Sequence, residues 1–317
     1  MGPRHWLFLG VFLALAACEA APPFSAQPLP EVVPRPSLRP QSEERSIASF
    51  ELEQFYLRLQ NDLQRRGLLR IDGGTFDATY TEKDLVRNFI RIAMSQEFKT
   101  EGNFMVEEAT GTTLRRWSGP IRVNLEFGQT VAESQQAEDR TRVKALTGTL
   151  SRVSGVPMRL SNAANTANFH VLVLNEDDRL AIRPRLKRLV PSLSEAAVRA
   201  IVNMDRSNLC IVFGLTGARA ADPFTTGLVV VRAEQPDLMR RACFHEEMAQ
   251  GLGLFNDDVD ARPSLFNDDE EFGLLTVHDE QLIRMLYDRR LRNGMTADDV
   301  LPIAERIASE LFTPQTN

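Results

Sequence analysis

The chain has 317 residues, with 37 Lys and Arg against 43 Asp and Glu, and a formal net charge of −6 at pH 7. Hydrophobic residues make up 43% of it, and its length allows one large core or two small ones. No basic stripe opposes the negative charge, which argues against nucleic acid as a partner.

The first residues have the pattern of a secretory signal. Arg4 and His5 give a short basic start, and an apolar run follows over residues 6–17. This run is too short to span a bilayer and has the length usual for a signal peptide. It ends in Leu-Ala-Ala-Cys, with the cysteine at Cys18, which resembles the lipobox of bacterial lipoproteins. The alternative is an ordinary signal peptide with an incidental cysteine.

The lipobox resemblance implies cleavage after residue 17 and acylation of Cys18, so that the protein is lipid-anchored in the bacterial envelope and faces the periplasm. Several acyl chains anchor stably, because each buried methylene contributes about 0.8 kcal/mol. Glu19 follows the cysteine, which slightly favours the outer membrane in the sorting rule of these lipoproteins. Residues 18–45, with seven prolines after Cys18, predict a semi-extended tether.

Two helices are expected in an N-terminal helical region, residues 46–97. A helical stripe of apolar residues marks the first, at Leu52, Phe55, Tyr56, Leu59 and Leu63. Thr81 and Asp84 have the spacing of a capping box and predict a second helix to about Gln96. The region forms either a small subdomain or helices packed on the main sheet.

The remaining residues, 98–317, are expected to form one α+β domain. Strands are predicted over 98–106 and 114–127, a helix over 134–153, and an apolar strand over 169–174. Strand, helix and strand in this order predict a right-handed crossover and parallel pairing.

Residues 176–208 resemble an insertion between strands. Five basic residues between Arg179 and Arg188 are typical of a solvated face, with an anionic-ligand site as the alternative. Ser192 and Glu195 predict the start of a short helix. Two further strands are expected, at 209–215 and 227–232.

A central helix is predicted next, opened by Pro236 and ended by Gly253. From Cys243 onward it reads C-F-H-E-E-M-A-Q-G-L-G-L-F-N-D-D. Glu246 and Gln250 are one turn apart and can point at a common centre. The expected core stripe consists of Leu238, Ala242, His245, Ala249 and Leu252.

This stretch resembles the H-E-x-x-H-x-x-G-x-x-H element of the metzincin metalloproteases. The five steps are occupied by Glu246, Glu247, Gln250, Gly253 and Asn256. In that family the histidines hold zinc and the glutamate is the general base, so the resemblance places Glu247 in the position of the base. The order of elements over residues 114–291 is also similar. The resemblance implies a zincin-like, mixed and partly parallel sheet with a central helix that carries a degenerate motif.

A second resemblance is to an uncharacterised bacterial family of secreted proteins and lipoproteins, known only as a domain of unknown function. It rests on E-E-x-x-Q-x-L-G-L-x-N-D, from Glu246 to Asp257, and on a later Leu-Tyr-Asp that begins at Leu286.

The ligand chemistry departs from the metzincin pattern, because Gln250 and Asn256 are neutral amides where the family has imidazoles. Amide oxygens suit calcium or magnesium better than zinc. The metzincin methionine turn is also absent, since no Met lies between Asn256 and Thr276. We therefore expect neither metal nor other cofactor, and a non-catalytic binding or scaffold role towards an envelope protein or peptide.

The alternative is a metal-dependent hydrolase with one divalent ion and Glu247 as general base. Its candidate ligands are Glu246, Gln250, Asn256, Asp257 and His278. A third hypothesis is an envelope scaffold or assembly factor that works through its N-terminal helices. His245 is expected to be a core or helix-end histidine rather than a base or a ligand.

The other two cysteines, Cys210 and Cys243, form an even pair once Cys18 is acylated. In an oxidising compartment this predicts a disulfide between a strand and the central helix, with two buried thiols as the alternative. Downstream, Leu-Phe-Asn-Asp-Asp occurs twice, from Leu254 and from Leu265, and predicts turns. The last two helices are predicted from two capping patterns, Thr276 with Asp279 and Thr296 with Asp299.

Overall fold

The computed structural model describes residues 44–74, 76–101, 104–219, 221–267 and 269–313. These residues belong to one compact unit, Gln41–Asn317. The predicted signal peptide, Cys18 and almost all of the tether lie outside the described residues. No helix in the described ranges is long and apolar enough to cross a bilayer.

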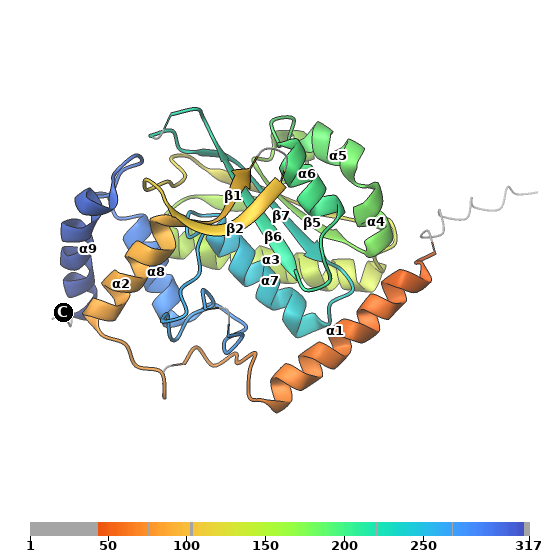
Figure 1. The fold of residues 1–317 in the computed structure, drawn as a ribbon, viewed down its shortest axis with the longest axis horizontal. Coiled ribbons are helices and arrows are strands. Elements are labelled where there is room, and N and C mark those ends of the chain that lie inside the picture. The colour runs from red at the N-terminus through yellow and green to blue at the C-terminus, as the bar shows by residue number, and fades with distance from the viewer. Residues whose placement is uncertain (1–43, 75, 102–103, 220, 268, 314–317) are drawn as a thin grey trace, which may run out of the picture. The chain divides into compact units, whose positions relative to one another are not determined.

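A five-stranded sheet with the order β4-β3-β5-β7-β6 lies at the centre of the unit (Figure 1). Its strands are β3 Ile121–Phe127, β4 Met158–Leu160, β5 Phe169–Leu174, β6 Cys210–Thr216 and β7 Phe224–Arg232. The first four strands in this order run parallel, and β6 pairs antiparallel with β7 at one edge. The predicted mixed, partly parallel α+β sheet is therefore confirmed. Parallel pairing of β3 with β5 follows from the crossover through α3, Glu133–Ser154.

Helices cover both faces of the sheet, as a buried parallel sheet requires. Along β5 the side chains of Phe169, Val171 and Val173 join one core, with α3 and the central helix α7, Asp237–Gln250. The side chains of Leu172 and Leu174 point to the other core, under α4 Glu176–Ala181, α5 Arg183–Leu189 and α6 Glu195–Val202. The strand reads as a continuous apolar run because both of its faces are buried.

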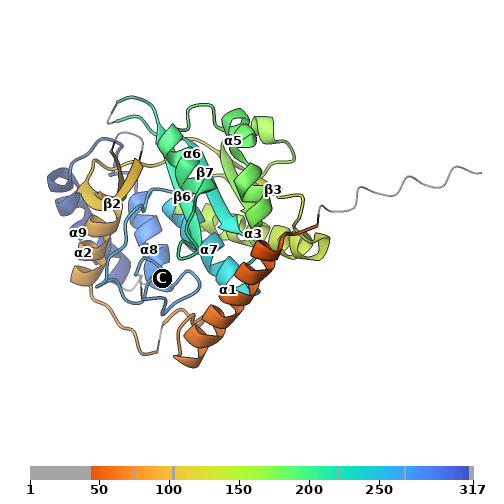
Figure 2. The same ribbon diagram turned by 45° about the vertical axis from the view of Figure 1, so that its right-hand side comes forward.

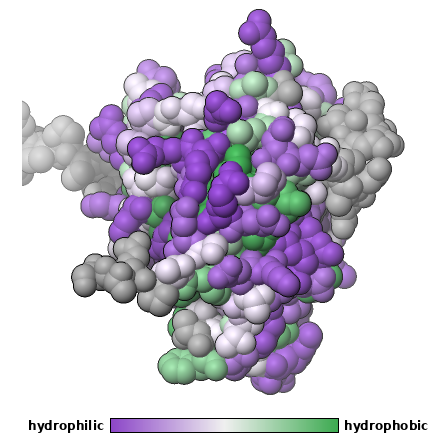
Figure 3. All heavy atoms as spheres, turned by 90° about the vertical axis from the view of Figure 1, so that its left-hand side faces the viewer, coloured by the Kyte–Doolittle hydropathy of each residue, from purple (hydrophilic) through white to green (hydrophobic). Residues whose placement is uncertain are grey.

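Four further helices complete the unit. The first, α1 Ile47–Arg65, packs its Tyr56 and Leu63 near Met239 at the start of α7 (Figure 2). The other three contact one another: α2 Glu82–Ala93, α8 Val277–Leu286 and α9 Ala297–Phe312. Figure 3 shows the face nearest to α2 and α9, which is mostly hydrophilic with scattered hydrophobic side chains.

The predicted capping boxes of α2, α8 and α9 are all confirmed, with Thr81, Thr276 and Thr296 as the N-caps. In α8 the capping carboxylate has a second role. Asp279 is fully buried and also accepts hydrogen bonds from Ser264 Oγ (2.5 Å) and Leu265 N (3.1 Å). This carboxylate therefore fixes the loop that precedes α8 as well as the start of the helix.

Several predicted boundaries were wrong. The strand expected over 98–106 is a hairpin, in which β1 Ser95–Glu101 pairs antiparallel with β2 Phe104–Gly111. The helix expected from Ser192 begins at Glu195, because the hydroxyl of Ser194 accepts the N–H of Ala197. Strand β7 begins three residues earlier than the expected Gly227.

A buried ion pair joins the two helices on one face of the sheet. Arg240 on α7 donates from Nε to both carboxylate oxygens of Asp139 on α3, at 2.9 and 2.8 Å. Burial raises the pKa of the Asp139 carboxyl, and Arg240 opposes that rise. Removing only one partner would leave a buried charge without its counter-ion, so this pair fixes the position of α7 relative to α3.

Candidate functional site

Helix α7 positions most of the candidate residues. Pro236 is its N-cap, as predicted, but the helix ends at Gln250 with Gly251 as its C-cap, not at Gly253. The predicted core stripe was partly right: Ala242, Ala249 and Leu252 are buried, but Leu238 and His245 are only partly buried. Phe244 and Met248 are fully buried, whereas His245 is only half-buried. The helix is covered on more than one side, so its burial does not follow a single apolar stripe.

The predicted disulfide joins α7 to the edge strand. Cys210 is the first residue of β6 and Cys243 lies in the middle of α7, with their Cα atoms 5.9 Å apart. Cys243 is buried in the main core, whereas Cys210 is half-buried. The bond fixes the distance between the two elements that flank the candidate site.

The chain turns sharply after α7. Gly253 has φ +130°, and a Cβ at this position would lie 2.4 Å from the carbonyl oxygen of Arg115. Two aromatic side chains, the buried Trp117 and the partly buried Tyr287, hold the same turn through hydrogen bonds. Trp117 donates its indole N–H to the carbonyl of Gly251 (2.8 Å), and Tyr287 donates its hydroxyl to that of Leu252 (2.9 Å). Only glycine fits this backbone approach, which brings the following loop back towards α7.

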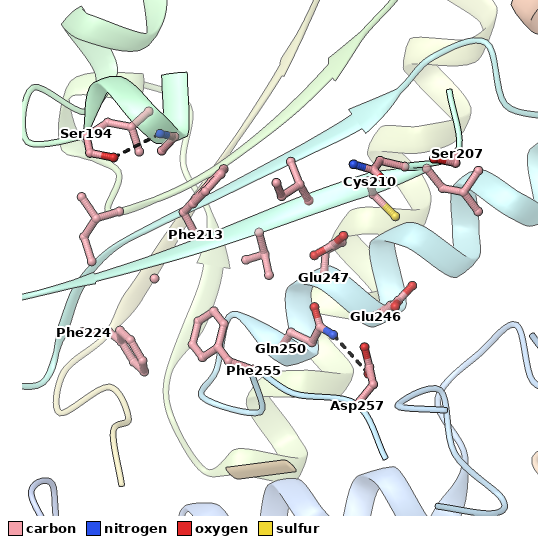
Figure 4. A pocket seen from close by; sticks show the side chains of 18 of the residues that line it. Ser194, Ser207, Cys210, Phe213, Phe224, Glu246, Glu247, Gln250, Phe255 and Asp257 are labelled. Atoms are coloured by element: carbon pink, nitrogen blue, oxygen red, sulfur yellow. Dashed lines mark hydrogen bonds between the residues drawn. The ribbon is translucent and has the colours of Figure 1, made fainter. Parts of the chain in front are cut away.

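A pocket of about 460 Å³ lies between β6, α7, the loop after α7 and the start of α6. Figure 4 shows Glu246, Glu247 and Gln250 on the side of α7 that faces it, with Asp257 from the loop beside them. Gln250 Nε2 lies 3.5 Å from Asp257 Oδ1. This volume is within the range of ligand-binding pockets.

Two other predicted site residues lie outside the lining of this pocket. The side-chain amide of Asn256 donates to the carbonyls of Arg91 (3.2 Å) and Asp257 (2.6 Å). His245 accepts the backbone N–H of Leu275 at Nδ1 (3.2 Å). Burial lowers the pKa of His245 to about 4, so this imidazole is neutral at pH 7. It is a structural histidine that ties α7 to the loop before α8.

The remaining described histidines are separated from the pocket. His278 is fully buried, and its Nε2 lies 3.1 Å from Asn88 Nδ2 on α2. His170 lies on β5, where burial lowers its pKa. In the described ranges of the chain, no group of three or more His, Cys, Asp or Glu side chains is arranged to hold a metal ion.

The pocket also contains residues that the motif did not point to. The ring centroids of Phe255 and Phe224 are 5.2 Å apart. Phe255 also lies against Gly214 of β6, where an added Cβ would be 2.5 Å from the Phe255 ring. Glu270 adds a carboxylate, and Leu193 and Ser194 line the side next to α6. Phe255 belongs to the repeated pentapeptide Leu-Phe-Asn-Asp-Asp, which was the sequence feature that marked this part of the pocket lining.

Most basic residues between Arg179 and Arg188 in the predicted insertion form ion pairs with nearby carboxylates. Arg183 and Lys187 both form ion pairs with Glu195 (2.7 and 2.6 Å). Arg185 Nη2 lies 2.6 Å from Glu126 Oε2. Arg179 is buried and contacts Glu176 (2.6 Å). Lys187 and Arg183 agree with the predicted solvated face, whereas Arg179 does not, because it is buried.

Part of the chain matches the model of a known family. The family model described as a protein of unknown function (DUF2927) matches residues 82–306. The match begins at α2 and includes the whole sheet, α7 and most of α9. Neither the curated proteins nor the solved structures include a match to the chain.

Proposed function

The chain belongs to the DUF2927 family, and we propose that it is a lipid-anchored protein of the bacterial envelope whose metalloprotease-like cleft binds a ligand without hydrolysing it. The proposal combines the lipobox at Cys18 with the pocket between β6 and α7. The order strand, helix, strand, strand pair, central helix, glycine turn and final helix supports a zincin-like relationship.

One observation supports a non-catalytic function of the cleft. Of the three residues at the metzincin ligand steps, Glu246 and Gln250 line the pocket, but Asn256 does not. The Asn256 amide nitrogen donates to two backbone carbonyls instead. The pocket therefore offers carboxylates and one amide but neither imidazole nor free thiolate, the ligands that zinc prefers, and these groups suit the polar groups of an organic ligand.

The second candidate is a metal-dependent hydrolase. It is favoured by the convergence of Glu246, Glu247 and Asp257 on one pocket, since carboxylates can bind a hard divalent ion and Glu247 could act as general base. His278 cannot assist in this pocket, because it is buried against Asn88.

Elemental analysis of the full-length protein, purified in detergent, separates the two candidates. We expect less than stoichiometric zinc, manganese, iron, calcium or magnesium, and a melting temperature that a chelator leaves unchanged. Stoichiometric metal that is lost in Glu246→Ala, and retained in a control such as Glu138→Ala on the exposed face of α3, would favour the hydrolase.

The lipid anchor is tested independently by mass spectrometry of the N-terminal peptide. We expect the wild-type protein to carry acyl chains on Cys18 and to sediment with membranes. The Cys18→Ala variant should carry none. An acylated, membrane-bound Cys18→Ala protein would refute the anchor without affecting the proposal for the cleft.

A further inference from the structure

Helix α1 exposes an apolar stripe on the side that faces away from the rest of the unit. Tyr56 and Leu63 are buried on its inner side. Ile47, Phe50 and Leu57 lie on the opposite side, because residues three and seven positions apart share one helix face. These three side chains are 78%, 52% and 42% exposed. A surface helix is usually polar on its outer side, so this stripe marks an interaction surface.

A second exposed apolar feature follows α1 directly. The loop between α1 and α2 exposes Ile71 (62%) and Phe76 (93%). It continues along the lower edge of the unit from the end of α1 in both ribbon views (Figures 1 and 2). Arg70 holds the ends of this loop together, since its Nη2 lies 3.0 Å from Asp72 Oδ2 and 2.7 Å from Asp77 Oδ1. The apolar side chains therefore belong to a loop whose two nearest carboxylates are already paired.

The place at which the anchored chain enters α1 indicates what covers this edge. Residues 19–45 are the predicted Pro-rich tether, and Ser46 is the N-cap of α1. The apolar stripe thus begins at Ile47, the first residue of the helix that follows the tether. A tether of this length and composition spans about 80 Å at most. It keeps the unit at a high local concentration near the bilayer, so that even a weak contact can dock it.

The charges beside the stripe are mixed. Arg58 and Arg65 share the exposed side of α1 with Glu51 and Asp62, and Arg65 lies 3.4 Å from Asp62. A face with both signs of charge is neither strongly attracted to an anionic surface nor repelled by zwitterionic headgroups. The apolar side chains therefore determine what this face binds.

We propose that the outer face of α1 is a docking surface for the phospholipid bilayer, with Ile47, Phe50 and Leu57 inserted at the boundary between headgroups and acyl chains. The inference rests on the proposed lipid anchor and is independent of what the cleft binds. A bilayer fits better than a protein partner, because a stable protein interface takes roughly 800 Å² on each side. A tethered interfacial helix needs only a shallow insertion of one face.

Quenching by brominated lipids tests this contact. Full-length protein is reconstituted in vesicles of phosphatidylcholine and phosphatidylethanolamine, with or without bromine on the acyl chains. The reporter is Phe50→Trp, and the control is Leu301→Trp at a similarly exposed position (43%) on α9, away from α1 in both ribbon views. Spectra are compared with the wild type, in which Trp117 is buried. We expect the brominated lipid to reduce the added emission of Phe50→Trp at least about twofold and to leave that of Leu301→Trp nearly unchanged. Equal quenching of the two would overturn the proposal.

Removal of apolar side chains tests whether the stripe makes the contact. A second reporter, Leu57→Trp, is combined with Ile47→Ser and Phe50→Ser. This combination should lose the quenching of Leu57→Trp alone, because serine has no apolar surface to insert. The control combines the same reporter with Val259→Ser and Leu301→Ser, two exposed positions outside α1, and should remain quenched. Loss in both combinations, or in neither, would refute a role of the stripe.

The same spectra separate the bilayer from a second copy of the chain. Contact between two copies would shift the emission of Phe50→Trp to the blue as the ratio of protein to lipid rises, and brominated lipid would not quench it. That result would overturn the proposal. We expect quenching that is independent of this ratio and that persists at about 1 M salt, where exposed charges are screened beyond about 3 Å. Loss of quenching at high salt would assign the contact to charges instead of the stripe.

Mass spectrometry of Cys18 on the same sample keeps the docking surface and the anchor apart. An acylated protein without selective quenching would refute the docking surface and leave the anchor standing. An unacylated protein that is still quenched selectively would refute the anchor and leave the docking surface standing. An unacylated and unquenched protein would refute both.

Discussion

Removal of the disulfide, by replacing Cys210 and Cys243 together with alanine, should destabilise the protein by about 5 kcal/mol in all. The bond joins residues separated by 33 positions in the chain, and the loop-closure entropy of a loop of that length is about 4 kcal/mol at 25 °C. Loss of the buried sulfur of Cys243, which is 2% exposed, adds roughly 1 kcal/mol. Because domains are typically stable by only about 5–15 kcal/mol, the loss is a large fraction of the total.

Urea denaturation followed by tryptophan fluorescence provides the assay. Trp117 is buried between β5 and the turn after α7, and the other tryptophan, Trp6, lies in the predicted signal peptide. The double variant should unfold at a lower urea concentration than the oxidised wild type. The wild type in the presence of a dithiol reductant should unfold close to the variant.

Two results would refute the reasoning. One is a double variant whose unfolding free energy stays within about 1 kcal/mol of the wild type, which would mean that the cross-link does not constrain the unfolded chain. The other is a wild type that reductant leaves unchanged although the double variant is destabilised. In that case the loss would come from packing of the two side chains and not from the bond.

Two further predictions use the same denaturation assay. Gly253→Ala should destabilise the protein by at least about 2 kcal/mol, because φ +130° and the Arg115 carbonyl leave no room for a Cβ. The control, Gly148→Ala at an exposed position inside α3, should stabilise the protein by about 1 kcal/mol. Changes of the same sign in the unfolding free energies of the two variants would contradict this prediction. Burial lowers the pKa of His245 from 6.5 to about 4. Between these pH values the imidazole takes up a proton in the unfolded chain but not in the folded one. The free energy of unfolding should therefore fall by about 3 kcal/mol as the pH decreases from 6.5 to 4. His245→Asn keeps an acceptor near the Leu275 N–H and should flatten that slope; an unchanged slope would assign it to other groups.

Local patterns in the sequence predicted much of the fold. The capping boxes at Thr81, Thr276 and Thr296 act within four residues, so their consequences can be read without knowledge of the fold. The apolar run of β5 likewise predicted its burial. The disulfide was predictable from the even number of cysteines left after the lipobox.

The candidate site was only partly predictable, because it depends on elements far apart in the chain. Glu246, Glu247 and Gln250 could be grouped from helical spacing alone. The orientation of Asn256 could not, since it depends on the carbonyl of Arg91 in α2, 165 positions earlier. The metzincin spacing placed Asn256 at a ligand step, but its amide is used in packing the loop against α2.

The side of the pocket next to α6 had no local signal in the sequence. Leu193 and Ala197 precede the sheet edge in an insertion that composition alone marked as a solvated surface. Their role arises from packing of α6 over β6, which sequence spacing does not encode. The core stripe of α7 was only partly predictable for a similar reason, because α3 and the strands β6 and β7 all contact that helix.

The way in which α1 is attached determines how the folded unit would carry a mechanical load. Ser46 N donates to Asp177 Oδ2 (2.9 Å), and Ser49 Oγ donates to the buried Glu234 (2.8 Å). Tyr56, two turns further on, donates to the carbonyl of Arg206 (2.9 Å). Tension applied through an anchored N-terminus would therefore break these hydrogen bonds one after another, starting at Ser46, before the strands of the sheet were pulled apart. Strand β6 and helix α7, held together by their covalent link, would be shielded from tension by the stepwise detachment of α1.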